Sequence, residues 1–201
     1  MGAYTAVADA SETLVELLRG QMRDLVVESD VALTSPGATG TDGTPRLTLF
    51  LYRTEVNPYL RNRDHAGTAD SRPKPGSLAL DLHYLLTAHP SDGGSDETAR
   101  SLEQQRVLGR AVQVLADNSV VTGSNLRASL ADDRELRVVF DSQSTNDAFE
   151  VWNTFTDVPF QPSVVCVVGP VFVESETAPE AQRVVSQQVD KHLLEGRDAD
   201  E

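Results

Sequence analysis

The segment from Leu78 to Pro90, LALDLHYLLTAHP, constrains the fold of this chain more than any other. Its side chains divide into two alternating sets, as they do along a β-strand, where successive side chains point to opposite faces of the sheet. One set is rich in leucine, and the other carries Asp81, His83 and His89. This period of two predicts a core strand, with one apolar face and one half-polar face.

Segments with strand and helix patterns lie on both sides of this strand. We predict, in chain order, a helix at 9–22, strands at 24–36 and 45–57, a long loop at 58–76, the strand at 77–90, a helix at 101–120, a strand at 134–143, a short helix at 144–155 and a strand-rich stretch at 159–175, interrupted at Gly169 and Pro170. This order predicts an α/β (mixed α+β) fold. We expect a single domain over residues 1–175, with one central mixed sheet, an N-terminal helix and one long helix packed on it, and long inter-strand loops. Residues 176–201 are acidic and are predicted to form a helix or a frayed tail.

The charge of the chain limits its partners. The 201 residues include 31 Asp and Glu against 17 Lys and Arg, which gives a net charge of −14 at pH 7. Nucleic acid is therefore not an expected partner, because phosphate binding needs clustered Lys and Arg. An acid excess with few lysines suggests a protein that is soluble in high salt, a hypothesis about habitat. No apolar run approaches about eighteen residues, so we expect no membrane-spanning helix, and the N-terminus lacks the pattern of a secretory signal.

Asp81, His83 and His89 share the half-polar face and are the candidate metal ligands. Neighbouring residues on one face of a strand lie about 7 Å apart, which places Asp81 near His83. His89 lies roughly 20 Å beyond His83 on a straight strand, whereas a metal holds its ligands at about 2 Å. The spacing therefore favours a half-polar sheet face, and we predict no metal site and no cofactor.

Signals of catalysis are also weak. The chain contains no nucleophile elbow, no Walker A loop and no dinucleotide-binding glycine motif. Cys166 lies in an apolar run, which is typical of a core residue and not of a nucleophile. His65 lies near Asp64 and Asp70 in the long loop, and this is the one arrangement from which a small hydrolase could be built. We predict that the protein has no catalytic residues and is not an enzyme.

Three aromatic residues are spaced to share one face of the predicted short helix. They are Phe149, Trp152 and Phe155. This spacing fits a helix packed on the core. It also fits an exposed aromatic anchor for a partner, because such anchors dominate many interfaces. The sequence leaves both interpretations open.

Several segments together, in their order along the chain, resemble one family. They are SETLVELL, LTLFLYRTEVNPYLRN, LALDLHYLLTAHP, EQQRVLGRAVQVLADNSVV, the tryptophan of FEVWNTF, and FQPSVVCVVGPVFV. The chain resembles the tail-terminator (cap) proteins of extracellular contractile injection systems, whose N-terminal domain was formerly of unknown function. These systems are phage-tail-like particles in which a contractile sheath surrounds an inner tube. The resemblance covers about residues 5–175 and does not extend beyond Glu174.

The resemblance implies a structural role without catalysis. Such proteins form a ring of copies of themselves, six in number, at the distal end of the inner tube and sheath, and the ring ends their polymerisation. The implied partners are further copies of this chain, the inner tube protein and the sheath protein. The implied location is the cytoplasm during assembly and then the particle, which can be released from the cell.

The candidate interface residues also follow from the resemblance. Arg53, Tyr59, Arg61 and Asn62 match the family's LYR…NPYLRN pattern. We expect them to contact neighbouring proteins, together with a sheet edge that is open to strand addition. Arg61 is the strongest candidate, because a guanidinium pairs with an interface carboxylate through two parallel hydrogen bonds. Two other roles stay open: a baseplate component of the same particle, and a cytoplasmic interaction adaptor unrelated to tails.

Overall fold

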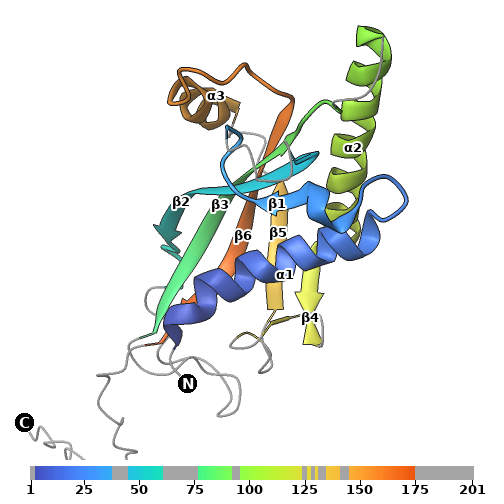
Figure 1. Ribbon diagram of the computed structural model, residues 1–201. Helices are drawn as coiled ribbons and strands as arrows, with labels where there is room; N and C mark the ends of the chain where they lie inside the picture. Colours follow the sequence, from blue (N-terminus) through green and yellow to red (C-terminus); the bar gives the residue numbers. More distant parts are fainter. Residues whose placement is uncertain are drawn as a thin grey trace, which may run out of the picture.

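Six strands form one sheet, in the order β1-β2-β3-β6-β5-β4 (Figure 1). The computed structural model describes residues 3–37, 45–60, 77–91, 96–123, 126–127, 130, 135–140 and 145–174. The strands are β1 (Val31–Leu33), β2 (Leu47–Val56), β3 (Leu78–Ala88), β4 (Val120–Thr122), β5 (Glu135–Phe140) and β6 (Ser163–Val173), and the helices are α1 (Ala6–Gln21), α2 (Glu97–Asp117) and α3 (Thr145–Asn153). Strand β1 is parallel to β2, and the other neighbours are antiparallel. The predicted mixed sheet in a single α+β domain is confirmed.

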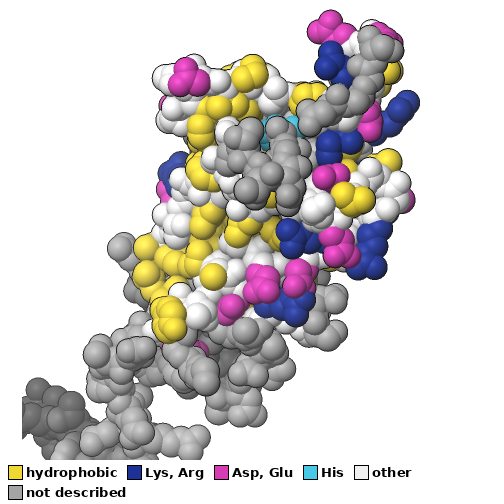
Figure 2. Space-filling view, in the orientation of Figure 1, with side chains coloured by type: hydrophobic (Ala, Val, Ile, Leu, Met, Phe, Trp, Pro, Cys, Tyr) yellow, Lys and Arg dark blue, Asp and Glu magenta, His cyan; other side chains and the backbone are white. Residues whose placement is uncertain are grey.

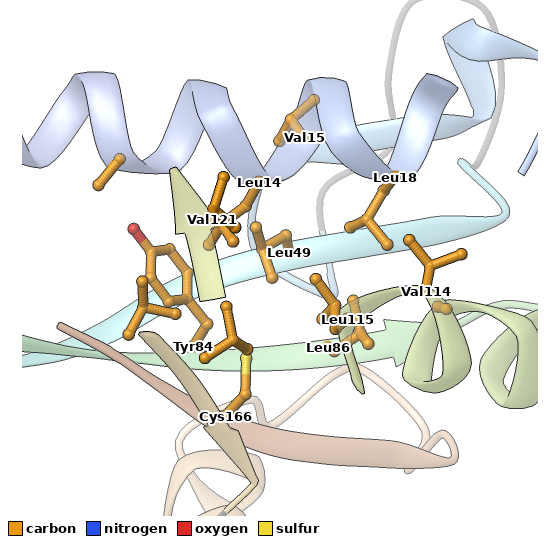
Figure 3. Packing of buried hydrophobic residues seen from close by; sticks show 14 of the residues in the cluster. Leu14, Val15, Leu18, Leu49, Tyr84, Leu86, Val114, Leu115, Val121 and Cys166 are labelled. Carbon is orange, nitrogen blue, oxygen red and sulfur yellow. The ribbon is translucent and has the colours of Figure 1, made fainter. Parts of the chain in front are cut away.

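The main core lies between one face of the sheet and the helices α1 and α2. Leu82, Tyr84 and Leu86 alternate along β3 and are fully buried on this face. They contact the apolar stripe of α1, in which Leu14 and Leu18 recur at helical spacing (Figure 3). The predicted leucine-rich face of the segment is therefore the core face, and β3 is the central strand that connects both halves of the sheet.

A second, smaller cluster lies on the opposite face of the sheet. Leu85 of β3, Val165 of β6 and Trp152 of α3 form its buried centre. Helix α3 covers only part of this face, because Val139 of β5, on the same face as Val165, is 57% exposed. The sheet is thus covered by α1 and α2 on one side and by the short helix α3 on part of the other.

Strand β6 runs without a break through Gly169 and Pro170, so the predicted interruption there is wrong. The two residues together lie opposite the single residue Asp81, since Leu80 pairs with Val171 and Leu82 pairs with Val168. This is a β-bulge, and a bulge accommodates a proline because the ladder needs no N–H donor there.

Several predicted boundaries differ from the structure by up to four residues, and one strand is much shorter than predicted. The predicted strand at 24–36 is reduced to Val31–Leu33, which follows a turn of 3₁₀-helix at Glu28–Asp30. Helix α2 begins four residues before its predicted start, because the carboxylate of Asp96 accepts a hydrogen bond from the Thr98 backbone N–H (3.2 Å) and caps the helix. The predicted C-terminal segment 176–201 lies outside the described residues.

Candidate functional site

The turn that follows β2 is fixed by one side chain, Asn57. Its Oδ1 accepts hydrogen bonds from the backbone N–H groups of Tyr59 (3.0 Å) and Leu60 (3.2 Å). Its Nδ2 donates to both carboxylate oxygens of Asp81 on β3 (3.1 and 2.9 Å). An asparagine that bonds its own turn in this way stabilises a tight change of direction after a strand. Asn57 therefore holds the turn and attaches it to the centre of the sheet.

Asp81 is itself held in place by the bulge in β6. The Cα of Gly169 lies against the Asp81 carboxylate, and a Cβ at this position would collide with Asp81 Oδ1 and come within 3.1 Å of the Leu80 carbonyl oxygen. Glycine is required here because two strands and a carboxylate approach one another closely. We call Asn57, Asp81 and Gly169 the turn clamp.

The clamp presents one predicted interface residue to solvent. Tyr59 is 90% exposed, the most exposed of the large apolar side chains that the structure describes. Arg53 lies on β2 itself and forms an ion pair with Glu55. Arg61 and Asn62 lie outside the described residues. The structure thus places Arg53 and Tyr59 on one strand and the turn that ends it.

The edge of β2 is the second feature of this site. Strand β1 pairs with β2 only along Leu47–Leu49. Among the described residues, no strand pairs with the remaining stretch 50–56 on that side (Figure 1). The outer edge of a sheet can offer backbone N–H and C=O groups to a further strand. The edge therefore fits the strand addition expected from the sequence.

A shallow hollow opens beside the turn, on the part of the sheet that α3 leaves uncovered. Its volume is about 430 Å³, and its lining includes Asn57, Asp81, Arg137, Val139 and Pro170. A lining that combines apolar and charged side chains is typical of an interface rim. The turn, the open edge and the hollow together form the candidate functional site.

The three candidate metal ligands lie in separate surroundings. Asp81 belongs to the turn clamp, and His83 Nε2 lies 3.4 Å from the Glu55 carboxylate. His89 is buried and its Nε2 lies 2.9 Å from Thr48 Oγ1, and burial lowers the pKa of its imidazole. Within the described ranges, no three histidine, cysteine or acidic side chains come together as metal ligands would.

Cys166 is fully buried in the main core, and this burial raises the pKa of its thiol to about 12. The thiol therefore stays protonated at neutral pH and packs as a small apolar group. His65, Asp64 and Asp70, the residues of the hydrolase alternative, lie outside the described residues.

The three aromatic residues divide between the two interpretations that the sequence left open, and Phe155 lies beyond the end of α3 and not on the helix as predicted. Trp152 is 6% exposed, and its indole N–H donates to Ser163 Oγ (3.1 Å). Phe155 packs edge-on against Trp152, with ring centroids 5.9 Å apart. Phe149 instead is 53% exposed and stacks on Phe160. Trp152 is a core residue, Phe155 is partly buried against it, and Phe149 is on the surface.

Sequence reasoning did not identify the turn clamp. The pair Asn57–Pro58 is a turn signal and could have drawn attention to Asn57. Its partners could not be found in this way, because the contact of Asn57 with Asp81 and of Asp81 with Gly169 depends on the register of three strands.

Comparison with known proteins adds a family and a shared fold. One family, described as the Pvc16 N-terminal domain, matches residues 9–187. The sheath/tube terminator of the extracellular contractile injection system PVC, in its extended state, is similar in structure, with a TM-score of 0.53 at 16% identity over 94% of this chain and 64% of that chain. The tube-terminating cap of the anti-feeding prophage is similar with a TM-score of 0.51 at 16% identity, over 89% of this chain and 59% of that one. The chain thus spans less than two thirds of the length of either protein.

No curated protein is significantly similar to the chain in sequence. None of the helices in the described ranges combines the length and the apolar character needed to cross a membrane.

Proposed function

The chain belongs to the Pvc16 N-terminal domain family, and we propose on this basis that it is a structural tube terminator of a contractile injection particle. In this role, copies of the chain form a ring, six in number, at the distal end of the inner tube and sheath. The ring ends the polymerisation of both. The protein assembles in the cytoplasm, remains part of the particle and catalyses no reaction.

The observation that supports this proposal most strongly is the shared fold. The likeness to a sheath/tube terminator extends over 94% of this chain, and the second similar structure is a tube-terminating cap. The buried thiol of Cys166 and the separate surroundings of Asp81, His83 and His89 also fit a structural role.

The candidate functional site supplies the contacts that such a protein needs. An exposed tyrosine on a rigid turn is a common interface anchor, because it has a large contact area and few rotatable bonds. We propose that Tyr59 and Arg53, continued by Arg61 and Asn62, contact a neighbouring tube, sheath or terminator subunit. The open edge of β2 accepts a strand from the same neighbour. The net charge of −14 favours a partner with a basic surface.

The mass of the purified protein in solution tests the ring. Light scattering at low and high salt is expected to give about six times the monomer mass, and electron microscopy is expected to show sixfold views. A Tyr59→Ala variant tests the site, and its matched control is Tyr4→Ala, since Tyr4 is 80% exposed at the start of the chain. A monomer at every concentration that also fails to bind isolated tube and sheath would contradict the proposal and favour an unrelated adaptor.

A further inference from the structure

An exposed aromatic pair lies on α3 and on the connection between α3 and β6. Phe149 is 53% exposed and Phe160 is 59% exposed. Their rings stack with centroids 6.0 Å apart, and Phe160 also lies 5.3 Å from the ring of buried Trp152. The pair is thus held rigidly on the core and yet faces water. Rigid exposed aromatic groups of this kind mark contact surfaces.

The surroundings of this pair are acidic. Residues 141–162 include four acidic residues and no Lys, Arg or His. Two of the four, Glu150 and Asp157, are exposed on α3 and on the turn that follows it. An aromatic surface with acidic neighbours is complementary to an apolar surface that carries arginine, because the carboxylates and the ring faces both attract a guanidinium. We call Phe149, Glu150, Asp157 and Phe160 the α3 patch.

The outer face of α2 has the complementary character. Leu102 on this face is 47% exposed, and Arg106 one turn further along is also exposed. Glu103, next to Leu102 in the sequence, bonds Arg46 (3.1 Å) and Ser91 (2.9 Å) and also interacts electrostatically with Arg106. Leu102 and Arg106 thus give this part of the outer face of α2 an exposed apolar group beside an exposed cation. Figure 2 shows Arg side chains, with Asp and Glu side chains among them, over α2 and the end of α1, on the opposite side of the molecule from α3.

Gly109 adds a second observation on the same face of α2. It lies in the interior of the helix, where glycine weakens the helix relative to alanine. A Cβ at Gly109 would meet nothing within 4 Å, so packing inside the chain does not require glycine there. A small residue beside Leu102 and Arg106 lets another chain approach the helix backbone closely.

We infer that the α3 patch of one copy of this chain docks on the outer face of α2 of the next copy. Phe149 and Phe160 then cover Leu102 and Gly109, and Arg106 pairs with Glu150 or Asp157. Helices α2 and α3 pack on opposite faces of the sheet, so each copy presents one half of the contact on each side. Such a head-to-tail contact between two different surfaces is what builds a closed ring. The inference rests on the proposed ring and identifies one of its interfaces.

Cysteine cross-linking tests the contact directly. A chain with Gly109→Cys is mixed with a differently tagged chain with Glu150→Cys under mild oxidation, and a cross-linked pair that carries both tags is expected. The native Cys166 is buried and does not compete. The control replaces Gly109→Cys by Gly20→Cys, an exposed helical glycine that also has nothing within 4 Å of its Cβ and lies on α1. This control pair is expected to give no cross-link.

Exchanging the charges of Arg106 and Glu150 gives a second test, in which self-association is measured and no core residue is changed. Arg106→Glu or Glu150→Arg alone is expected to weaken self-association by about tenfold or more, and the two together are expected to restore it to within about threefold. Arg23→Glu is the control, because Arg23 is exposed and pairs with Glu28 at the end of α1.

The outcomes separate this inference from the proposed function. If the parent chain forms a ring and neither the cross-link nor the charge rescue is seen, the α2–α3 contact is overturned and the ring stands. If the parent chain stays monomeric and the cross-link is absent, two proposals are overturned: the α2–α3 contact, and a ring that forms in solution without tube or sheath. A cross-link together with charge rescue supports the contact.

Discussion

The turn clamp illustrates how single polar side chains determine the shape of a surface in this protein. Asn57 bonds two backbone N–H groups of its own turn and the carboxylate of Asp81. The Cα of Gly169 leaves room for that carboxylate. The exposed position of Tyr59 therefore depends on half-buried neighbours behind it.

Gly169→Ala is the first prediction at this scale. The added methyl group meets the Asp81 carboxylate and the Leu80 carbonyl oxygen, so the strands must separate or Asp81 must leave Asn57. We expect a loss of about 1–3 kcal/mol in the free energy of unfolding, the usual cost of overpacking. Gly109→Ala is the matched control and is expected to raise stability by about 1 kcal/mol. Urea denaturation of both variants measures the two changes in the free energy of unfolding. Equal changes in the two variants would contradict the role of Gly169 in the turn clamp.

His89 gives a prediction for pH. Burial lowers the pKa of its imidazole in the folded state, whereas the unfolded chain takes up the proton near the ordinary value of about 6.5. The unfolded state therefore binds more protons, and stability is complete above about pH 6.5 and falls as the pH drops further. In His89→Gln this part of the pH dependence is expected to disappear. Urea midpoints between about pH 5 and pH 8 test it, and an unchanged slope in the variant would count against the assignment.

Among the elements, those with a long and regular pattern could be predicted from the sequence. The faces of β3 followed from its period of two, and α2 followed from its apolar stripe, because each pattern depends on a single element. The bulge at Gly169 and Pro170 could not be predicted in this way, since it depends on how β6 pairs with β3. The surface position of Phe149 could not be predicted either. Helical spacing shows which residues share a face, but it does not show how far the core extends along that face.

Helix α3 supports a prediction about the second cluster. Trp152 is 6% exposed and bonds Ser163, so Trp152→Ala leaves a cavity between α3 and the sheet. We expect a loss of about 3–5 kcal/mol in the free energy of unfolding. Phe149→Ala, three residues earlier on the same helix, is expected to cost about 1 kcal/mol or less, because its ring is 53% exposed. Circular dichroism during urea unfolding compares the two variants, and similar losses would show that α3 is not anchored as described.

The whole molecule carries a net charge of −14. Its acidic side chains repel one another in the compact state, which destabilises the fold. Many of its described arginines lie near α2 and the end of α1, where they pair with Asp24, Glu28 and Glu103. These ion pairs offset part of the negative charge in that region.

Added salt tests the effect of this charge on the folded chain. From about 0.1 M to about 1 M sodium chloride the Debye length shortens from about 10 Å to about 3 Å, which screens the repulsion. We expect the free energy of unfolding to rise by about 1 kcal/mol or more over this range. Urea unfolding of the monomer at both concentrations measures the change. A flat response would remove the support for a high-salt habitat.

The turn clamp also has a consequence for how this protein ages. Asparagine side chains deteriorate with time when the backbone nitrogen of the next residue attacks the side-chain carbonyl and closes a ring. Pro58 follows Asn57, and a proline nitrogen carries no hydrogen and cannot complete this reaction. The residue that orients the turn is therefore protected by its neighbour from the commonest chemical lesion of asparagine.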